Sequence, residues 1–363
     1  MLLAQSHNLV DSKQELTVVW LKNNATSFTG SVQLGGKEEI RSFYGRVEGS
    51  TFAFYAGVGD QGIYRGTWNA STQTINWNTT PELIIDAGDD VGNEGRVLAM
   101  TQCNGSVYAA VKRRIYRRNN NGTLVVDTDS LGDNSSRWVR VNVENIRADA
   151  ASGWRGLTCV TQGSSPALLA TYESAEGTTL IPVPYAGKIV RFNNLPSGEL
   201  SAKADWTPTV EGDVGDITAA GLTAMGRPTA GADIGYTIAA YNEWQPFTSG
   251  GVLRHIAGMQ FQWKNSCPAD RQCQNADADA AACFIVRNPG TTPTFSFDCL
   301  QGTGMPLKAK DTDGVIEYRE AFVAIRTIEP SPWDADVSYY GGIDGNSVPH
   351  NGSAWIAKVD LTP

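Results

Sequence analysis

Charged side chains recur along this chain at one kind of position, at the ends of short apolar segments with small residues interleaved. The residues at these ends are Asp60, Arg113, Glu173, Glu243 and Asp344. All of them except Arg113 are carboxylates. Two carboxyl groups roughly 5 to 9.5 Å apart can serve as the acid and the base or nucleophile of glycoside hydrolysis. The recurrence therefore predicts a cluster of catalytic acids, whereas loop acids that merely face solvent are the plainer interpretation.

Two further charged residues extend this hypothesis. His350 follows Asp344 in what we expect to be the same loop, where an imidazole would act as a general base or a metal ligand. Arg113 would hold an anionic group of a substrate, such as a uronate, sulfate or phosphate, because a guanidinium forms paired hydrogen bonds to such groups. Otherwise Arg113 only offsets the surrounding acids.

Aromatic side chains in neighbouring loops would provide flat apolar faces on which sugar rings stack. These residues are Trp154, Tyr185 and Trp244. Other tryptophans fall within expected strands, where they would pack in the core. The predicted partner is therefore a small molecule or an oligosaccharide.

The acidic run DAGDDVGNEG at residues 86–95 supplies the oxygen ligands that calcium prefers. Its candidate ligands are Asp86, Asp89 and Asp90. The run has neither the spacing nor the final glutamate of an EF-hand loop, so a solvated loop is the competing interpretation. Calcium is the one cofactor that the sequence suggests.

Short alternating or β-branched segments separated by Gly, Asn, Asp and Pro predict an all-β fold. A strand with an aliphatic pair followed by a basic residue recurs at 63–67, 115–119, 189–193, 284–288 and 355–359. A strand precedes each of these, at 51–60, 107–113, 167–173, 234–243 and 336–344. Another comes before those, at 41–47, 96–102, 155–162, 217–225 and 321–328. Four units continue into a further strand near 74–80, 138–143, 203–208 and 294–300.

The last unit lacks that further strand, which we expect the N-terminal segment LTVVWLK at 16–22 to supply. Such a ring of four-stranded antiparallel sheets leaves few exposed sheet edges. The chain resembles the β-propeller superfamily over almost all its length. The resemblance implies one domain over 1–363 with five blades, a disulfide-restrained insertion at about 244–283, and loops after the second strands that open on one face. Six blades would hold if 244–316 contained another blade.

The cysteines suggest an oxidising compartment, because they form no CxxC pair typical of zinc sites. They are Cys103, Cys159, Cys267, Cys273, Cys283 and Cys299. We expect disulfides, with four of these residues restraining one polar stretch.

Sequons for N-glycosylation support secretion. They begin at Asn24, Asn69, Asn78, Asn104, Asn121, Asn134 and Asn351. Asn-Gly-Ser/Thr is also ordinary hairpin chemistry, which would account for Asn104, Asn121 and Asn351. The first residues lack the charged and apolar regions of a signal peptide, so we expect such a segment to have been removed.

The charge balance argues against nucleic acid as a partner. The 363 residues include 29 Lys and Arg against 38 Asp and Glu, a formal net charge of -9 at pH 7. An anionic chain is repelled by a phosphate backbone. No apolar run approaches the length of about 20 residues that a membrane helix needs.

These observations favour a secreted hydrolase or lyase that acts on carbohydrate through an acidic channel mouth. Five-bladed glycosidases of the arabinanase and invertase clans are similar in architecture, although their Asn-Asp-Pro and Arg-Asp-Pro segments are absent here. One alternative is a lectin-like or adhesion propeller without enzymatic activity. Another is a calcium-dependent propeller of the lactonase or phosphoesterase type.

Overall fold

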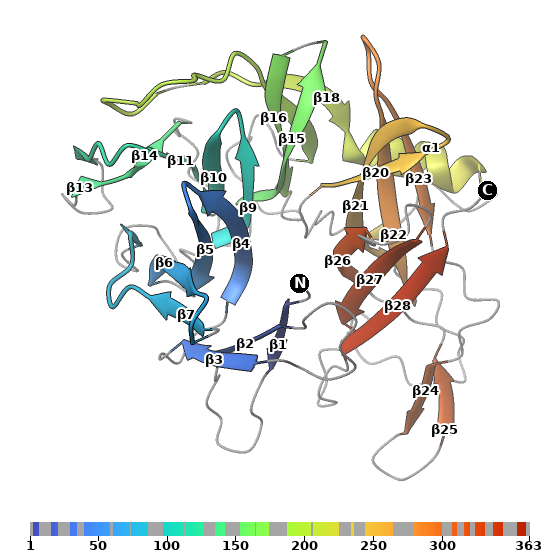
Figure 1. Ribbon diagram of the computed structural model, residues 1–363. Coiled ribbons are helices and arrows are strands. Elements are labelled where there is room, and N and C mark those ends of the chain that lie inside the picture. Colours follow the sequence, from blue (N-terminus) through green and yellow to red (C-terminus); the bar gives the residue numbers. More distant parts are fainter. Residues whose placement is uncertain are drawn as a thin grey trace. The chain divides into compact units, whose positions relative to one another are not determined.

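The fold is all-β, as the sequence predicts. A computed structural model describes residues 3–6, 16–20, 30–34, 40–58, 61–72, 74–85, 97–111, 114–126, 135–141, 153–163, 165–173, 187–204, 206–224, 234–235, 244–263, 279–299, 307–310, 316–319, 324–330, 337–343 and 354–360 (Figure 1). Within these ranges the strands form antiparallel sheets, and α1 (Val214–Ala224) is the one helix. No helix in these ranges is long and apolar enough to cross a membrane.

The chain divides into two compact units. Unit 1 contains residues 1–150 and 196–207, and unit 2 contains residues 151–195 and 208–363. The chain therefore leaves unit 1, returns to it for twelve residues and leaves it again. Each unit is described by itself below.

Unit 1 contains two larger sheets. Sheet 1 has β4 (Ile40–Glu48), β5 (Thr51–Val58), β6 (Gly62–Asn69) and β7 (Thr74–Trp77) in chain order, with β8 (Leu83–Ile84) also paired to β6. Sheet 2 has the order β9 (Val97–Cys103), β10 (Ser106–Val111), β11 (Arg114–Arg118) and β14 (Trp138–Arg140). Two small sheets are formed by β1 (Leu3–Ser6), β2 (Leu16–Trp20) and β3 (Gly30–Leu34), and by β12 (Val125–Val126) and β13 (Ser135–Ser136).

Unit 2 contains a four-stranded sheet, an eight-stranded sheet whose two parts are called sheet 4 and sheet 5, and a hairpin. Sheet 3 has β15 (Gly153–Gln162), β16 (Ser165–Glu173), β17 (Lys188–Phe192) and β18 (Thr209–Asp213). Sheet 4 has β20 (Gln245–Ser249), β21 (Val252–Trp263), β22 (Asp279–Asn288) and β23 (Thr294–Cys299), with β19 (Ile234–Gly235) on β21. Sheet 5 has β26 (Ala324–Pro330), β27 (Val337–Ile343) and β28 (Ala354–Asp360), joined to β21 by one pairing. A hairpin is formed by β24 (Leu307–Lys310) and β25 (Ile316–Arg319).

The repeated basic residues occupy one equivalent position, on the third strand of each sheet. Each lies directly opposite a residue of the second strand. The pairs are Tyr55 with Arg65, Tyr108 with Arg117, Leu169 with Arg191, His255 with Arg287, and Tyr339 with Lys358. The sequence repeat is therefore also a repeat of strand register.

A helix replaces the strand expected at 217–225. The carboxylate of Asp213 accepts hydrogen bonds from the backbone nitrogens of Gly215 at 2.8 Å and Asp216 at 3.2 Å. Asp213 thus caps the first turn of α1 (Val214–Ala224), and the alanines that follow favour the helix. The sequence correctly predicted regular structure for this apolar segment, but it predicted the alternation of a strand where the structure has a helix.

Sheet 4 also uses strands other than those expected. Within the expected strand 234–243 the described residues are Ile234–Gly235, which form β19. The strand β21 (Val252–Trp263) takes the place of the second strand opposite β22. Residues 245–263, assigned by the sequence to an insertion, thus belong to the sheet. Because β20 and β21 are joined by the Gly250–Gly251 turn, their pairing is local and closes a short loop.

The segment 16–22 does not complete the last sheet. Its strand β2 has β1 on one side and β3 on the other, so both of its edges are occupied. Both partners are close in sequence, and closing these short loops costs less conformational entropy than pairing with the far end of the chain.

The segment expected as a fourth strand of sheet 3 lies instead on sheet 2. The backbone nitrogens of Ala204 and Trp206 donate to the carbonyl oxygens of Arg140 at 3.0 Å and Val141 at 3.1 Å. The indole of Trp206 packs on the Tyr108 ring with centroids 6.0 Å apart. Residues 196–207, called the return segment below, therefore extend sheet 2, and β18 completes sheet 3.

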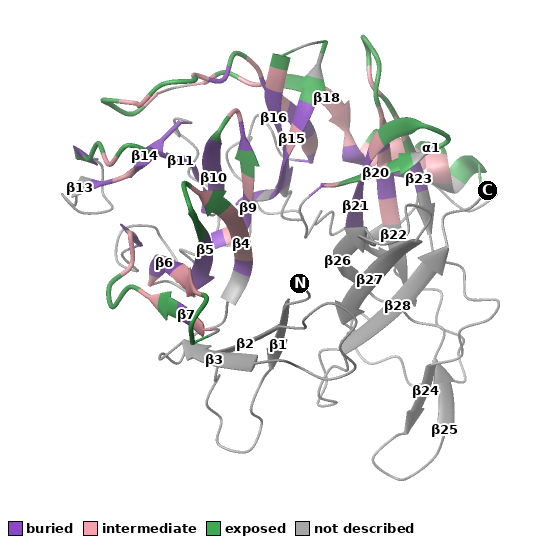
Figure 2. Ribbon diagram, viewed as in Figure 1, coloured by how far each residue is buried: buried purple, intermediate pink, exposed green. Residues whose placement is uncertain are grey.

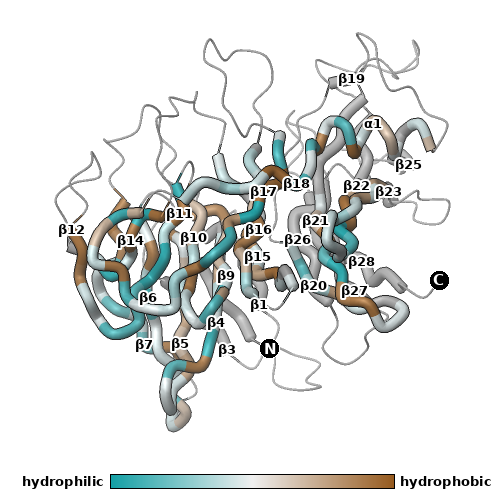
Figure 3. The backbone as a smooth tube through the Cα atoms, turned by 90° about the horizontal axis from the view of Figure 1, so that it is seen from above, coloured by the Kyte–Doolittle hydropathy of each residue, from teal (hydrophilic) through white to brown (hydrophobic). Residues whose placement is uncertain are grey.

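Each unit has its own hydrophobic core. Tyr55, Tyr116 and Trp138 are buried between sheets 1 and 2, where the Tyr55 and Trp138 rings meet edge to face at 5.9 Å. In unit 2, a core cluster includes Val214 of α1 and Phe297 of β23. Buried residues run along inner strands such as β10, whereas β18 has only exposed and intermediate residues (Figure 2). Hydrophobic and hydrophilic stretches correspondingly alternate along the backbone (Figure 3).

One glycine tests the packing of β8 against sheet 1. Gly62 has φ of +128°, and a Cβ atom there would lie 1.8 Å from the carbonyl oxygen of Leu83. We expect Gly62→Ala to lower the free energy of unfolding by about 3 kcal/mol, because backbone must move. The control Gly49→Ala has φ of +60° with no atom within 4 Å of its Cβ, and should cost about 1 kcal/mol. Equal losses in urea unfolding would contradict this description.

Candidate functional site

Four of the predicted charged residues share a topological position. Glu173 is the last residue of β16, and Asp60, Arg113 and Asp344 come within two residues of the ends of β5, β10 and β27. Each of these is the second strand of its sheet. Asp60, Arg113 and Asp344 themselves lie outside the described residues. The strand bounds thus preserve the recurrence that the sequence suggested.

Glu243 does not share this position. The second strand of sheet 4 is β21, which ends at Trp263, whereas Glu243 precedes β20 and lies outside the described residues. The proposed equivalence of Glu243 with the other strand-end acids is corrected accordingly. The other candidates outside the described residues are Tyr185, His350, Asp86, Asp89 and Asp90. Where side chains are described, no three His, Cys, Asp or Glu residues gather as a metal site would require.

Trp154 and Trp244 are core residues. Each is 1% exposed. The Trp154 ring packs edge to face on Tyr172 with centroids 4.9 Å apart. The Trp244 Nε1 donates a hydrogen bond to Thr171 Oγ1 at 2.8 Å. Neither indole has a free face on which a sugar could stack.

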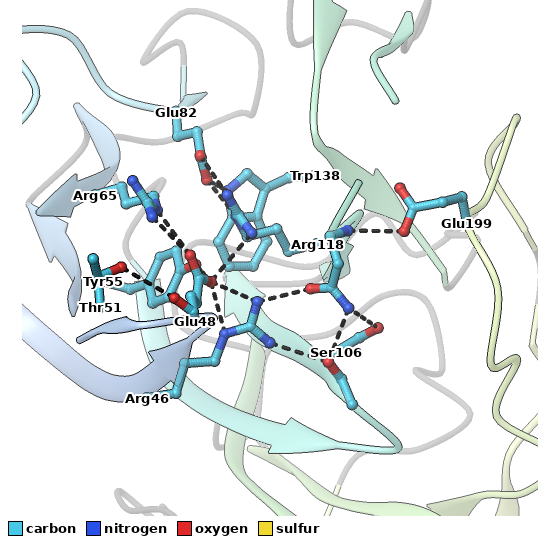
Figure 4. Close-up of polar contacts among 12 residues, drawn as sticks. Arg46, Glu48, Thr51, Tyr55, Arg65, Glu82, Ser106, Arg118, Trp138 and Glu199 are labelled. Atoms are coloured by element: carbon cyan, nitrogen blue, oxygen red, sulfur yellow. Dashed lines mark hydrogen bonds and ion pairs between the residues drawn. The ribbon is translucent and has the colours of Figure 1, made fainter. Parts of the chain in front are cut away.

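The best defined polar cluster of the described residues is centred on Glu48, at the end of β4 (Figure 4). Arg46 Nε donates to Glu48 Oε1 at 2.7 Å, and Arg65 Nη2 donates to Oε2 at 2.7 Å. The Tyr55 hydroxyl also donates to Oε1. Arg118 of sheet 2 adds a longer ion pair at 3.4 Å. The Glu48 carboxylate of sheet 1 thus pairs with arginines of both sheet 1 and sheet 2.

Arg118 is the link between the two sheets. Its Nε and Nη2 donate to the two carboxylate oxygens of Glu82 at 2.7 and 2.8 Å. Trp138 Nε1 donates to the same carboxylate at 3.1 Å. The side chain of Arg118 is 2% exposed, and its guanidinium lies 5.2 Å from the centre of the Tyr55 ring. This paired geometry is the strongest that Arg offers a carboxylate.

The electrostatics of Glu48 exclude one role. Burial raises the pKa of Glu48, but the hydrogen bonds from Tyr55, Arg65 and Arg46 and the charge of Arg118 outweigh it and lower the pKa to about 2. Burial raises the pKa of Tyr55 to about 12. Glu48 is therefore ionised at neutral pH and cannot serve as a general acid.

Unit 2 contains a matching cluster around Glu211 of β18. Arg287 Nε and Nη2 donate to the two oxygens of Glu211 at 2.8 and 3.0 Å, and both side chains are 2% exposed. Arg191 Nη1 donates to Glu211 Oε1 at 2.5 Å. Arg191 belongs to sheet 3 and Arg287 to sheet 4.

Glu48 and Glu211 therefore have the same structural role, which is to pair with arginines of two successive sheets. Each joins the third-strand arginine of its own sheet to a third-strand arginine of the next sheet. We call the two clusters the arginine bridges: Arg65–Glu48–Arg118 and Arg191–Glu211–Arg287. The recurring basic residue was the sequence signal for Arg65, Arg191 and Arg287. Arg118, which follows the recurring Arg117, and the two glutamates had no such signal.

Two cysteines confirm part of the disulfide prediction. Cys103 and Cys159 are disulfide-bonded. Cys283 and Cys299 lie directly opposite each other on β22 and β23. Cys267 and Cys273 lie outside the described residues.

Comparison with known proteins gives no assignment. No protein-family model matches the chain, and its sequence matches no curated protein.

The low pKa of Glu48 makes stability depend on pH. Its folded pKa of about 2 lies below the ordinary value of 4.5, so its contribution is present above pH 4.5 and is lost as the pH falls toward 2. We expect the free energy of unfolding to fall by about 2 kcal/mol in this window, a value reduced because Glu48 is partly solvated and its interactions are screened. Urea unfolding at pH 5, 4 and 3 measures this change.

The variant Glu48→Gln isolates this effect. This variant should be less stable than the parent at pH 7, and its free energy of unfolding should fall less than that of the parent between pH 5 and pH 3.

His255 affects stability in a different pH window, because burial and the charge of Arg287 lower its pKa from 6.5 to about 4. Its contribution is thus lost as the pH falls from 6.5 toward 4 in both proteins. Parallel stability curves for the two proteins below pH 5 would contradict the role of Glu48.

Proposed function

We propose that the protein is a secreted, carbohydrate-active hydrolase or lyase whose acids lie at the ends of the second strands. The observation that carries this proposal is that the second strands of four sheets end at a charged residue or within two residues of one in the sequence. These residues are Asp60, Arg113, Glu173 and Asp344. Charge at one repeated position is what a site built from several repeats requires.

We further propose that the sheets are the blades of a five-bladed β-propeller. Each of sheets 1 to 4 contains four antiparallel strands whose order in the sheet follows the chain, and sheet 5 contains three. Sheets 4 and 5 are joined by the pairing of β21 with β26. Full closure or radial repetition of such sheets protects their edges. In this architecture the loops after the second strands open on one face.

Glu173 and Asp344, both of unit 2, are the proposed acid and base. Glu48 and Glu211 are committed to the arginine bridges, so the proposal assigns the chemistry to carboxylates outside these bridges. A pair of nearby carboxylates acquires separated pKa values, which supplies one proton donor and one acceptor. Asp60, Arg113 and His350 would bind the substrate or assist the proton transfer.

Secretion is supported by the disulfide-bonded Cys103 and Cys159, since disulfides persist in oxidising compartments. A lectin-like protein would use the same strand ends without breaking a bond. The burial of Trp154 and Trp244 removes two of the aromatic platforms that either a lectin-like protein or a carbohydrate-active enzyme would use.

The proposal is tested with purified protein and a panel of neutral and acidic oligosaccharides, in calcium and in EDTA. Chromatography measures products, and thermal shift measures binding. We expect Glu173→Gln and Asp344→Asn each to lower the rate at least about 100-fold with an unchanged melting temperature. The matched control Asp216→Asn changes an exposed acid of α1 and should leave the rate unchanged.

Full activity in both strand-end variants would refute the site. Binding of a sugar without product would replace the enzyme by the lectin-like alternative. Loss of activity in EDTA, restored by calcium, would move the proposal toward the calcium-dependent class.

A further inference from the structure

An exposed sequon follows β11 in unit 1. Asn121 and Thr123 of Asn121-Gly122-Thr123 are both exposed. The turn is fixed by Asn119, whose Nδ2 donates to the carbonyl oxygen of Thr123 at 3.1 Å and to that of Leu200 at 2.8 Å. Gly122 has φ of +88°, which suits glycine. The acceptor amide is thus presented on a well-anchored turn.

Exposed aliphatic side chains lie immediately beside this sequon. Leu124 is 59% exposed and Val126 is 52% exposed, whereas Val125 between them is 8% exposed. The alternation is that of a strand with one apolar face toward solvent. A neighbouring group that removed this aliphatic surface from water would gain free energy. The apolar C–H face of a sugar ring has the chemistry and the attachment point to do so.

The other described sequons lack this combination of an exposed acceptor and exposed aliphatic neighbours. Asn78 and Thr80 of Asn78-Thr79-Thr80 are exposed as well, but the next aliphatic residue, Leu83, is 5% exposed.

Asn69 Oδ1 accepts hydrogen bonds from Ser71 N at 3.0 Å and Ser71 Oγ at 2.7 Å, which ties its side chain into a turn. Asn104 has φ of 46° in a hairpin turn, and Ser106 of the same sequon is 1% exposed. This geometry is that of a tight hairpin turn, which accounts for the Asn-Gly-Ser sequence at Asn104 without a glycan.

The position of Asn121 keeps a glycan away from the proposed site. Asn120 Nδ2 donates to the carbonyl oxygen of Gly105 at 2.9 Å, so this turn lies beside the β9–β10 turn. That turn is where β10 begins, and Arg113 follows the opposite end of β10. A glycan at Asn121 would leave the second-strand ends open.

We propose that Asn121 carries an N-linked glycan whose first sugars cover Leu124 and Val126. In the transfer, the Asn121 amide nitrogen bonds to the sugar C1 of a lipid-linked oligosaccharide diphosphate. The bond from C1 to the diphosphate breaks, and the lipid diphosphate and one proton leave. The inference rests on the proposed secretion but not on the proposed catalytic acids.

The test uses the full chain secreted from a eukaryotic host. Peptide mass spectrometry after peptide N-glycosidase treatment in heavy-oxygen water reads the occupancy of each sequon. We expect Asn121 to be occupied in the parent and in Thr123→Ser, which retains the sequon. Thr123→Ala should lose the mass of one glycan, as should Asn121→Gln. Asn76→Gln changes an exposed asparagine outside any sequon and should lose nothing.

A second measurement tests the covering role. Enzymatic removal of the glycan should raise the binding of a hydrophobic dye to the folded parent at least twofold. The same treatment should produce no rise in a variant carrying Leu124→Ser and Val126→Ser. An equal rise in both proteins would overturn the covering role.

A failure of this inference can be distinguished from a failure of the proposed secretion. A bare Asn121 beside occupied sequons elsewhere would overturn this inference and leave secretion intact. No glycan at any sequon would overturn this inference and count against secretion. Neither result changes the expected behaviour of Glu173→Gln.

Discussion

The arginine bridges are the interaction on which the arrangement of the sheets depends. Sheets of this kind meet face to face through apolar side chains, which attract without fixing direction. Glu48 and Glu211 add directional contacts, because each carboxylate accepts from arginines of two successive sheets. Removing Glu211 would leave the guanidinium of Arg287, whose side chain is 2% exposed, without its carboxylate, at a cost of about 3 to 5 kcal/mol. The bridges therefore specify how neighbouring sheets pack within each unit.

The bridges also explain why the third-strand arginine recurs while its surroundings vary. In sheet 2 the equivalent residue, Arg117, donates instead to the carbonyl oxygens of Pro196 and Gly198 at 3.3 and 2.6 Å. The return segment thus takes the place of a glutamate there. The same arginine position serves a carboxylate in one sheet and a backbone in another. Arg65, Arg117, Arg191 and Arg287 thus have structural contacts at this position.

Much of the fold could be predicted from the sequence, because hairpin strands pair with near neighbours. The strands of sheets 1 and 2 and the register of Arg65 and Arg117 follow from local patterns. The bridges could not be predicted, since Glu211 and Arg287 are 76 residues apart. The helix α1 was not predicted, because the alanine-rich run after Asp213 was interpreted as a strand and the capping role of Asp213 was not recognised. The strand-end acids were predicted by recurrence alone. Glu243 does not follow the strand that pairs with β22, because a different apolar segment, β21, forms that strand.

The most direct test of the bridges is a double-mutant cycle on Glu211 and Arg287, measured by urea unfolding at pH 7. The cycle compares the parent, Glu211→Gln, Arg287→Met and the double variant. We predict a coupling of at least about 2 kcal/mol, since both side chains are 2% exposed. The half-exposed pair Lys188 and Asp213, each 32% exposed, should couple by less than about 1 kcal/mol. Additive losses at Glu211 and Arg287 would contradict the bridge as the contact that holds sheets 3 and 4 together.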